Sequence, residues 1–187
     1  MGRVVVTEFV SIDGVAEDPG GSEDKDFGGW AFEFDRGEEG DKFKTGEMEP
    51  ADAMLLGRVT YEGFAEAWPS REGEFADMFN NIKKYVVTST LSDPEWTNSE
   101  VVSSDDLAGA VEELRSKHDG DLVVHGSLQL ARELLAKGLV DELRLMVYPT
   151  VLGAGKRLFG DAESPVAMKL TETLPAGETI CLVYQPK

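Results

Sequence analysis

Three short segments rich in glycine and hydroxyl side chains each follow an apolar run, and their chemistry suits an anionic ligand. They are Gly57-Arg58-Val59-Thr60, Thr88-Ser89-Thr90 and Gly126-Ser127. Glycine lets a ligand approach the backbone closely, and arginine pairs phosphate oxygens in a bidentate way. Together the segments indicate a dinucleotide site, and the arginine favours NADPH over NADH because it suits an extra phosphate. Each segment alone is more typical of ordinary helix capping.

The third segment lies within a strand–glycine–helix–strand pattern. An apolar run over residues 122–124 predicts a strand, and apolar residues at three- and four-residue spacing over 128–135 predict a helix. We expect Ser127 to be the N-cap, with its hydroxyl accepting a first-turn N–H, and Gly138 to end the helix. A second strand is predicted over residues 141–148. Such a unit places free backbone N–H groups beside phosphates.

The rest of the chain alternates strand and helix patterns and ends in a hairpin. Strands are predicted over residues 4–12, 53–56, 85–87, 166–174 and 179–185, and helices over 32–48, 61–68 and 107–117. Alternation of this kind predicts an α/β fold whose mostly parallel sheet has an antiparallel edge. Ligands of such sheets bind outside the carboxyl ends of the strands, where all three polar segments are expected.

A long irregular segment, residues 15–29, follows the first strand. Loops of this length are uncommon in compact domains and are usually either functional or disordered. Phe27 and Trp30 flank a Gly28-Gly29 pair, and aromatic side chains seldom occupy purely solvated loops. We favour a functional loop, and the alternative is an acidic surface loop.

Length and composition limit the number of domains, the kinds of partner and the location that we expect. The chain has 187 residues, which fits one domain over residues 1–187, and its formal net charge is −18. That charge argues against nucleic acid and anionic membranes as partners. The single cysteine, Cys181, lies in an apolar run and is expected to be buried and inert. Without a signal peptide or a run of membrane-spanning length, the cytoplasm is the expected location.

Several other site types lack the residues they need. Two histidines and one cysteine do not make a dedicated zinc site, so no metal site is expected. Neither G-x-G-x-x-G after a strand nor a phosphate-binding Walker loop is present. His118 is read as a cation at a helix end. His125 is read either as a packed strand-end side chain, which is more typical, or as a catalytic base.

An ordered set of motifs resembles a known family. The motifs are Ser11-Ile12-Asp13-Gly14, Leu56-Gly57-Arg58-Val59-Thr60-Tyr61-Glu62, Gly126-Ser127, Leu139-Val140-Asp141-Glu142-Leu143 and Pro149-Thr150-Val151-Leu152-Gly153-Ala154-Gly155. The chain resembles the dihydrofolate reductase superfamily over nearly its whole length. It is more similar still to the reductase domain of the bifunctional riboflavin-biosynthesis deaminase-reductase, in its stand-alone form. No deaminase zinc motif precedes this region.

The resemblance implies a dihydrofolate reductase-like three-layer fold, bound NADPH and a homodimer. It makes Val15 and Ala16 part of a loop that closes over the nicotinamide. His125 stands where the family commonly has glycine, so it is expected to contact the cofactor. Val15, Ala16 and His125 therefore belong to the expected cofactor-binding set. Its other members are Gly57, Arg58, Thr60, Thr88, Ser89, Thr90, Gly126, Ser127 and Leu128.

The resemblance also suggests residues on the substrate side. Dihydrofolate reductases hold the pterin with a carboxylate five residues after a tryptophan, and Trp30 and Asp35 have that spacing. Asp13 is the competing candidate for orienting the substrate or relaying a proton. Trp30 is expected to stack on the substrate or to line the pocket that holds it.

We therefore expect an NADPH-dependent reductase that passes hydride to a pyrimidine- or pteridine-like heterocycle. A rival reading is a non-catalytic NADP(H)-binding module that serves as a dimeric sensor or structural unit. A third is a dimeric domain whose pocket no longer binds a nucleotide.

Overall fold

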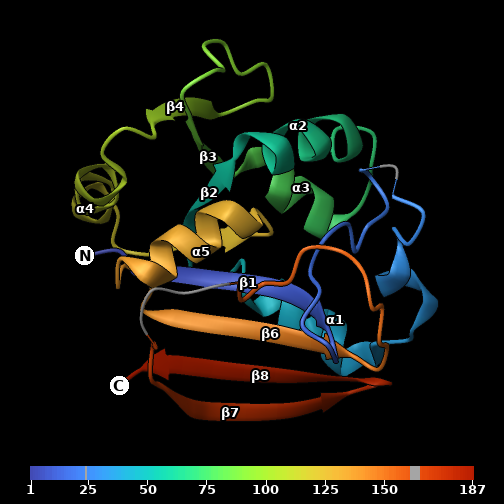
Figure 1. The fold of residues 1–187 in the computed structure, drawn as a ribbon. Coiled ribbons are helices and arrows are strands. Elements are labelled where there is room, and N and C mark those ends of the chain that lie inside the picture. Colours follow the sequence, from blue (N-terminus) through green and yellow to red (C-terminus); the bar gives the residue numbers. More distant parts are fainter. Residues whose placement is uncertain (24, 161–164) are drawn as a thin grey trace.

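A single eight-stranded sheet organises the computed structural model, which describes residues 1–23, 25–160 and 165–187. Its strand order is β4-β3-β2-β5-β1-β6-β8-β7 (Figure 1). The strands are β1 (Val4–Ser11), β2 (Ala51–Gly57), β3 (Lys83–Thr88), β4 (Ser99–Ser103), β5 (Asp121–His125), β6 (Glu142–Tyr148), β7 (Met168–Ala176) and β8 (Thr179–Pro186). β8 is antiparallel to both β6 and β7, and the other neighbours are parallel. The predicted mostly parallel sheet with an antiparallel C-terminal hairpin is confirmed.

Helices cover both faces of this sheet. They are α1 (Gly37–Gly46), α2 (Arg58–Ala67), α3 (Glu74–Asn81), α4 (Leu107–Lys117) and α5 (Leu128–Ala136). α4 and α5 pack on one face, whereas α2 and α3 pack on the other with α1 farther along it (Figure 1). This is the expected three-layer arrangement.

Burial on both faces explains the continuous apolar strands. The first residues of β1 and the centre of β5 are fully buried, so alternate side chains enter opposite layers. Val4, Val6 and Val10 join the core beneath α4 and α5, and Phe9 packs on the opposite face near α1. Cys181 is buried, as predicted, and desolvation raises its pKa to about 11.

The expected helix over residues 32–48 is wrong in its first part. A 3-10 turn, η1 (Trp30–Glu33), gives way to extended backbone, and α1 begins only at Gly37. The Glu178 N–H donates to the carbonyl oxygen of Asp35 (2.7 Å), so the β7–β8 turn holds this segment out of a helix.

Two elements have no counterpart in the predicted set. β4 is an edge strand with half-buried and exposed residues, so it lacks an apolar signal. α3 is only eight residues long and buries Ala76 and Phe79. Short elements of this kind are defined by their packing partners more than by local sequence.

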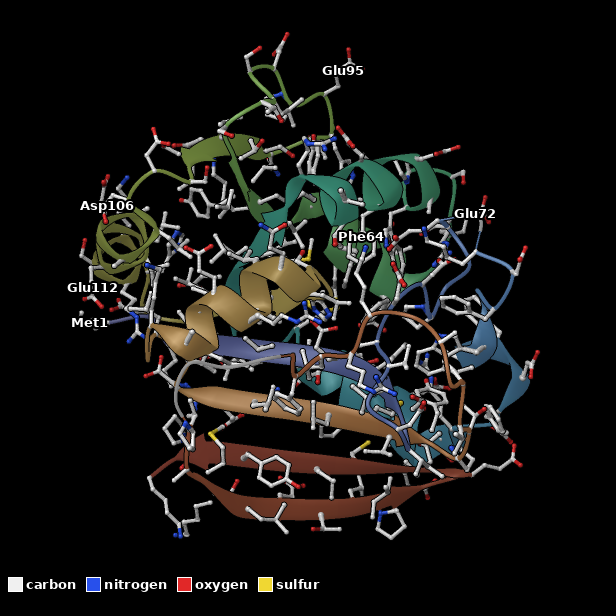
Figure 2. All side chains as sticks on the ribbon, viewed as in Figure 1. Met1, Phe64, Glu72, Glu95, Asp106 and Glu112 are labelled. Atoms are coloured by element: carbon white, nitrogen blue, oxygen red, sulfur yellow. The ribbon has the colours of Figure 1, made fainter. Side chains whose placement is uncertain are left out.

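The surface is dominated by acidic side chains. Glu72, Glu95, Asp106 and Glu112 project outward from separate parts of the chain in Figure 2. Within residues 1–23, 25–160 and 165–187, no helix has both the length and the apolar character that crossing a membrane requires.

Candidate functional site

Two central strands part at the edge where the carboxyl ends of the parallel strands lie. The ladder between β1 and β5 ends at Thr7 and His125, whereas β1 remains paired with β6 as far as Ser11 and Tyr148. Residues 8–11 of β1 therefore run beyond the last β5 partner, and we call this place the β1–β5 separation. Ligands of open α/β sheets bind outside such strand ends.

Four of the predicted cofactor residues converge beside the β1–β5 separation. The Gly57 N–H donates to Ser127 Oγ (2.9 Å), which joins the end of β2 to the start of α5. A Cβ added to Gly126 would lie 3.4 Å from Thr60 Cγ2, and the Gly126 φ is 59°. Gly126 therefore combines a left-handed backbone with a close approach to α2. These features fit the cradle that a dinucleotide phosphate needs.

Ser127 does not cap α5 in the way we predicted. It occupies the N-cap position with φ 65°, yet its side chain makes no capping hydrogen bond. Its Oγ accepts from Gly57 instead. Leu128, the first residue of α5, is half-buried. The first turn of α5 thus lacks a side-chain cap from Ser127, an arrangement that suits an anion at a helix N-terminus.

Arg58, the first residue of α2, is paired on its own helix. Its Nη1 lies 2.8 Å from Glu62 Oε2, and both side chains are more than two-fifths exposed. Exposed ion pairs of this kind contribute only about 0–1 kcal/mol. A phosphate would therefore displace Glu62 at little cost, and the bidentate guanidinium would gain a stronger partner.

The three hydroxyl residues Thr88, Ser89 and Thr90, at the end of β3, differ in their environments. Thr88 is buried, and its Oγ1 accepts from the N–H groups of Thr90 and Leu91 (3.0 and 3.2 Å), which closes the turn. Ser89 and Thr90 are exposed. Only these last two side chains are therefore presented to solvent beyond the strand end.

The loop predicted to close over the nicotinamide is joined by backbone hydrogen bonds to the segment after β6. Val15 pairs with Arg157 in an isolated antiparallel bridge, and the Ala16 N–H donates to the carbonyl oxygen of Lys156 (3.0 Å). Val15 and Ala16 are both buried. Gly155 has φ 104°, and a Cβ there would lie 2.8 Å from Val15 Cγ1. A residue larger than glycine at this position would push the two strapped segments apart.

Asp13 holds two turns together. Its carboxylate accepts from Ser11 Oγ (2.7 Å), Leu152 N–H (3.1 Å) and Gly153 N–H (2.9 Å). These hydrogen bonds, that of Ser11 foremost, lower the pKa of Asp13 to about 2. A carboxylate that is ionised at neutral pH and already accepts three bonds is a poor proton donor. The geometry favours a positioning task.

Trp30 and Asp35 lie in different environments. Trp30 is 3% exposed, donates from Nε1 to the Glu17 carbonyl oxygen (3.0 Å) and packs edge-to-face with Tyr148. Asp35 is exposed, and its Oδ1 accepts from the Gly37 N–H (2.7 Å) at the start of α1. Both residues therefore have structural partners in this conformation, and their predicted substrate roles need side chains that turn toward a ligand.

His125 belongs to a buried layer beneath α1 and α3. Its Nε2 lies 3.2 Å from Met48 Sδ, and its ring packs on Phe79. Desolvation, with the nearby Lys44 charge as a smaller cause, lowers the pKa of His125 well below its usual value. The imidazole is therefore neutral, and a packed strand-end role is favoured over that of a base.

Sequence reasoning missed several buried polar residues near the β1–β5 separation. Lys44 pairs with Glu47, and Thr7 Oγ1 lies 2.9 Å from Lys44 Nζ and 2.7 Å from Glu47 Oε1. Glu8 is buried in the middle of β1. A lone acid inside an apolar strand is a usable signal for Glu8, but nothing local pairs Lys44 with β1.

The part of the chain that the structure describes contains no group of three or more histidine, cysteine, aspartate or glutamate residues that could hold a metal ion. Glycines, hydroxyls and an exposed arginine are instead the groups gathered near the strand ends. This donor set suits a phosphate-bearing organic cofactor.

Known proteins resemble this chain in sequence and in structure. A family model described as the RibD C-terminal domain matches residues 3–182. The uncharacterized protein YyaP of Bacillus subtilis (strain 168) is 27% identical over 176 residues, which are 91% of this chain and 87% of that protein.

Two solved structures show the fold. A putative riboflavin biosynthesis protein from Shewanella sp. PV-4 has a TM-score of 0.79 at 19% identity, with 99% of each chain covered. Dihydrofolate reductase from Enterococcus faecalis, in complex with NADP(H) and RAB-propyl, has a TM-score of 0.60 at 16% identity, with 100% of this chain and 97% of that chain covered. The predicted dihydrofolate reductase-like fold is confirmed.

Proposed function

The chain belongs to the RibD C-terminal domain family, and on that premise we propose that it is an NADPH-dependent reductase. Its substrate would be a pyrimidine- or pteridine-like heterocycle, because the structural relatives include a putative riboflavin biosynthesis protein and a dihydrofolate reductase. Reduction of a 5-amino-6-(5-phosphoribosylamino)uracil-like compound or of a dihydrofolate-like compound fits this description.

One observation carries the proposal. Gly57, Thr60, Gly126 and Ser127 come from two distant parts of the sequence and converge beside the β1–β5 separation. These two glycines, the two hydroxyl residues and the first turn of α5 lie together at the carboxyl ends of the strands, which is where dinucleotides bind in open α/β sheets.

The chain's own residues would bind and orient the reactants. Arg58, released from Glu62, would pair the 2′-phosphate, and the start of α5 would face the pyrophosphate. The strapped loop containing Val15 and Ala16 would exclude water from the nicotinamide ring. NADPH supplies the hydride when it is bound, and the protein supplies position and electrostatics.

We also propose, from the family resemblance, that the protein acts as a homodimer in the cytoplasm. Its net negative charge suits a protein that binds small molecules rather than one that binds nucleic acid or an anionic membrane. Sedimentation equilibrium of the purified chain tests the dimer, because a mass near 20.4 kDa would contradict it.

A second candidate is an NADP(H)-binding sensor without catalysis. The engaged carboxylates favour it, since Asp13 accepts three hydrogen bonds and Asp35 accepts one from the Gly37 N–H. Asp13, whose carboxylate is held by these three bonds, is poorly placed to relay a proton in this conformation.

The two candidates differ in turnover. In the test, the protein and NADPH are incubated with each of a panel of dihydropteridines, aminopyrimidine ribosides and flavins. Absorbance at about 340 nm reports the oxidation of NADPH. Oxidation of NADPH with one panel member supports the reductase. Saturable NADPH binding without oxidation across the panel would favour the sensor, and absence of binding would contradict both.

A further inference from the structure

Glu8 is placed where β1 leaves its β5 neighbour. It is the first residue of β1 beyond the Thr7–His125 pair, and it stays paired with Leu145 of β6 on its other side. In register it is level with Gly126, the glycine that leads into α5. Glu8 therefore lies at the mouth of the β1–β5 separation.

The side chain of Glu8 points to the face covered by α5. Side chains alternate along a strand, so Glu8 shares a face with Val6 and Val10. Both valines belong to the core that includes Leu130 and Ala131 of α5. Ala16, from the loop predicted to close over the nicotinamide, belongs to the same core.

Glu8 is a buried acid without a full set of partners. It is 3% exposed, and its Oε1 has no hydrogen-bond partner among the residues that the structure describes. Desolvation raises the pKa of Glu8 to about 8, although the Lys44 charge opposes the shift, so the carboxyl is neutral at pH 7. A buried carboxyl oxygen that lacks a partner has lost its hydration without replacement, and a hydrogen bond from a ligand would offset that loss.

We propose that Glu8 binds the carboxamide of the nicotinamide ring and so fixes the orientation of the ring at the β1–β5 separation. The inference rests on the proposed function, since it names a contact of the same cofactor. A neutral carboxyl group matches a primary amide, because its O–H donates to the amide oxygen while its carbonyl accepts from the amide N–H.

The other buried polar cluster does not carry a comparable inference. Lys44, Glu47 and Thr7 satisfy one another through hydrogen bonds on the opposite face, which is the signature of a structural network. Glu8 differs because its Oε1 has no partner within the part of the chain that the structure describes, and because its backbone lies where the β1–β5 ladder ends.

Two substitutions separate a ligand contact from a structural role. Glu8→Leu removes both polar functions at nearly the same volume, and burial of an apolar group at this position favours folding. Glu8→Gln retains a donor and an acceptor. Thermal melting of both variants checks that they fold before any ligand is added.

Three probes are titrated against the wild-type chain and both variants. NADPH carries the carboxamide, its reduced 3-acetylpyridine analogue lacks the amide N–H groups, and adenosine 2′,5′-bisphosphate lacks the whole ring. Glu8→Leu is expected to weaken NADPH binding about 10- to 100-fold, as loss of two hydrogen bonds predicts, while Glu8→Gln stays within about threefold of the wild type. Adenosine 2′,5′-bisphosphate should bind all three proteins equally.

The acetylpyridine analogue gives the sharpest result. Wild-type protein should bind it about tenfold more weakly than NADPH, and this difference should vanish in Glu8→Leu. If Glu8→Leu instead weakens adenosine 2′,5′-bisphosphate as much as NADPH, or leaves NADPH binding unchanged, Glu8 does not contact the carboxamide. If wild-type protein binds neither NADPH nor adenosine 2′,5′-bisphosphate, the proposed function fails, and the Glu8 contact fails with it.

Discussion

Ionisation of Glu8 predicts how the free energy of unfolding depends on pH. Burial raises the pKa of Glu8 from 4.5 to about 8, so the folded chain keeps a proton that the unfolded chain releases. When the unfolded state binds fewer protons than the folded state, the free energy of unfolding falls as the pH rises. The fall begins near pH 4.5 and levels off above about pH 8.

The magnitude follows from the size of the shift. Each pH unit inside this window costs about 1.4 kcal/mol, and the slope halves as the pH reaches the folded pKa. From pH 6 to pH 8 the Glu8 contribution to the free energy of unfolding should therefore fall by about 2 kcal/mol. Glu8→Gln cannot ionise, so this contribution is absent from the variant.

Urea unfolding of wild type and Glu8→Gln at pH 6, 7 and 8 measures the effect. The stability of the variant relative to wild type should increase by about 2 kcal/mol across this range. The subtraction removes contributions that both proteins share, such as that of Lys84, whose pKa desolvation lowers to about 8. A difference that stays constant with pH would refute the claim that Glu8 is folded as a neutral, buried acid.

Three further predictions concern Arg58, two left-handed glycines and Asp13. Arg58→Ala should raise the Michaelis constant for NADPH about 10- to 100-fold and change that for NADH little, because only NADPH offers a 2′-phosphate; an equal effect on both would remove the assignment. Gly126→Ala and Gly138→Ala should each lower the free energy of unfolding by about 1 kcal/mol, since both glycines are left-handed, with φ 59° and 67°. Only Gly126→Ala should also weaken NADPH binding in a fluorescence titration, because a Cβ at Gly138 meets no atom of the described residues within 4 Å. Hydrogen bonds lower the pKa of Asp13 to about 2, so its stabilising contribution is present above pH 3.8 and is lost as the pH falls toward 2. Acid-unfolding curves of wild type and Asp13→Asn test this, and a wild-type loss in that window no steeper than that of the variant would contradict it.

Local signals in the sequence were sufficient for the main framework. Apolar runs predicted the central strands, because burial on both faces requires them. Gly138, which was predicted to end its helix, follows α5 with a left-handed backbone. Each of these features is determined within a few residues, so spacing and residue type were enough to identify it.

Features that depend on distant partners could not be predicted. Ser127 was expected to cap its own helix, but it bonds Gly57, which lies 70 positions away. The late start of α1 depends on a hydrogen bond from the Glu178 N–H, near the end of the sequence, to the carbonyl oxygen of Asp35. Periodicity describes which face of an element is apolar, and it carries no information about such long-range hydrogen bonds.

The candidate site shows the same division. Residue types identified the glycines and hydroxyls that converge beside the β1–β5 separation. Glu8 was not identified, because its importance depends on where the β1–β5 ladder ends and on an oxygen that has no partner among the described residues. Both facts emerge only from the packed sheet.

A titration of the purified wild-type chain with NADPH and with NADH tests the central claim most directly. Tryptophan fluorescence reports binding, and the shift in melting temperature measures the stabilisation that binding to the folded state must produce. We expect saturable binding of NADPH at least about tenfold tighter than that of NADH, because Arg58 would contact the 2′-phosphate. If neither nucleotide changes the fluorescence or the melting temperature, the proposed reductase function is contradicted, and only the assignment of the fold remains.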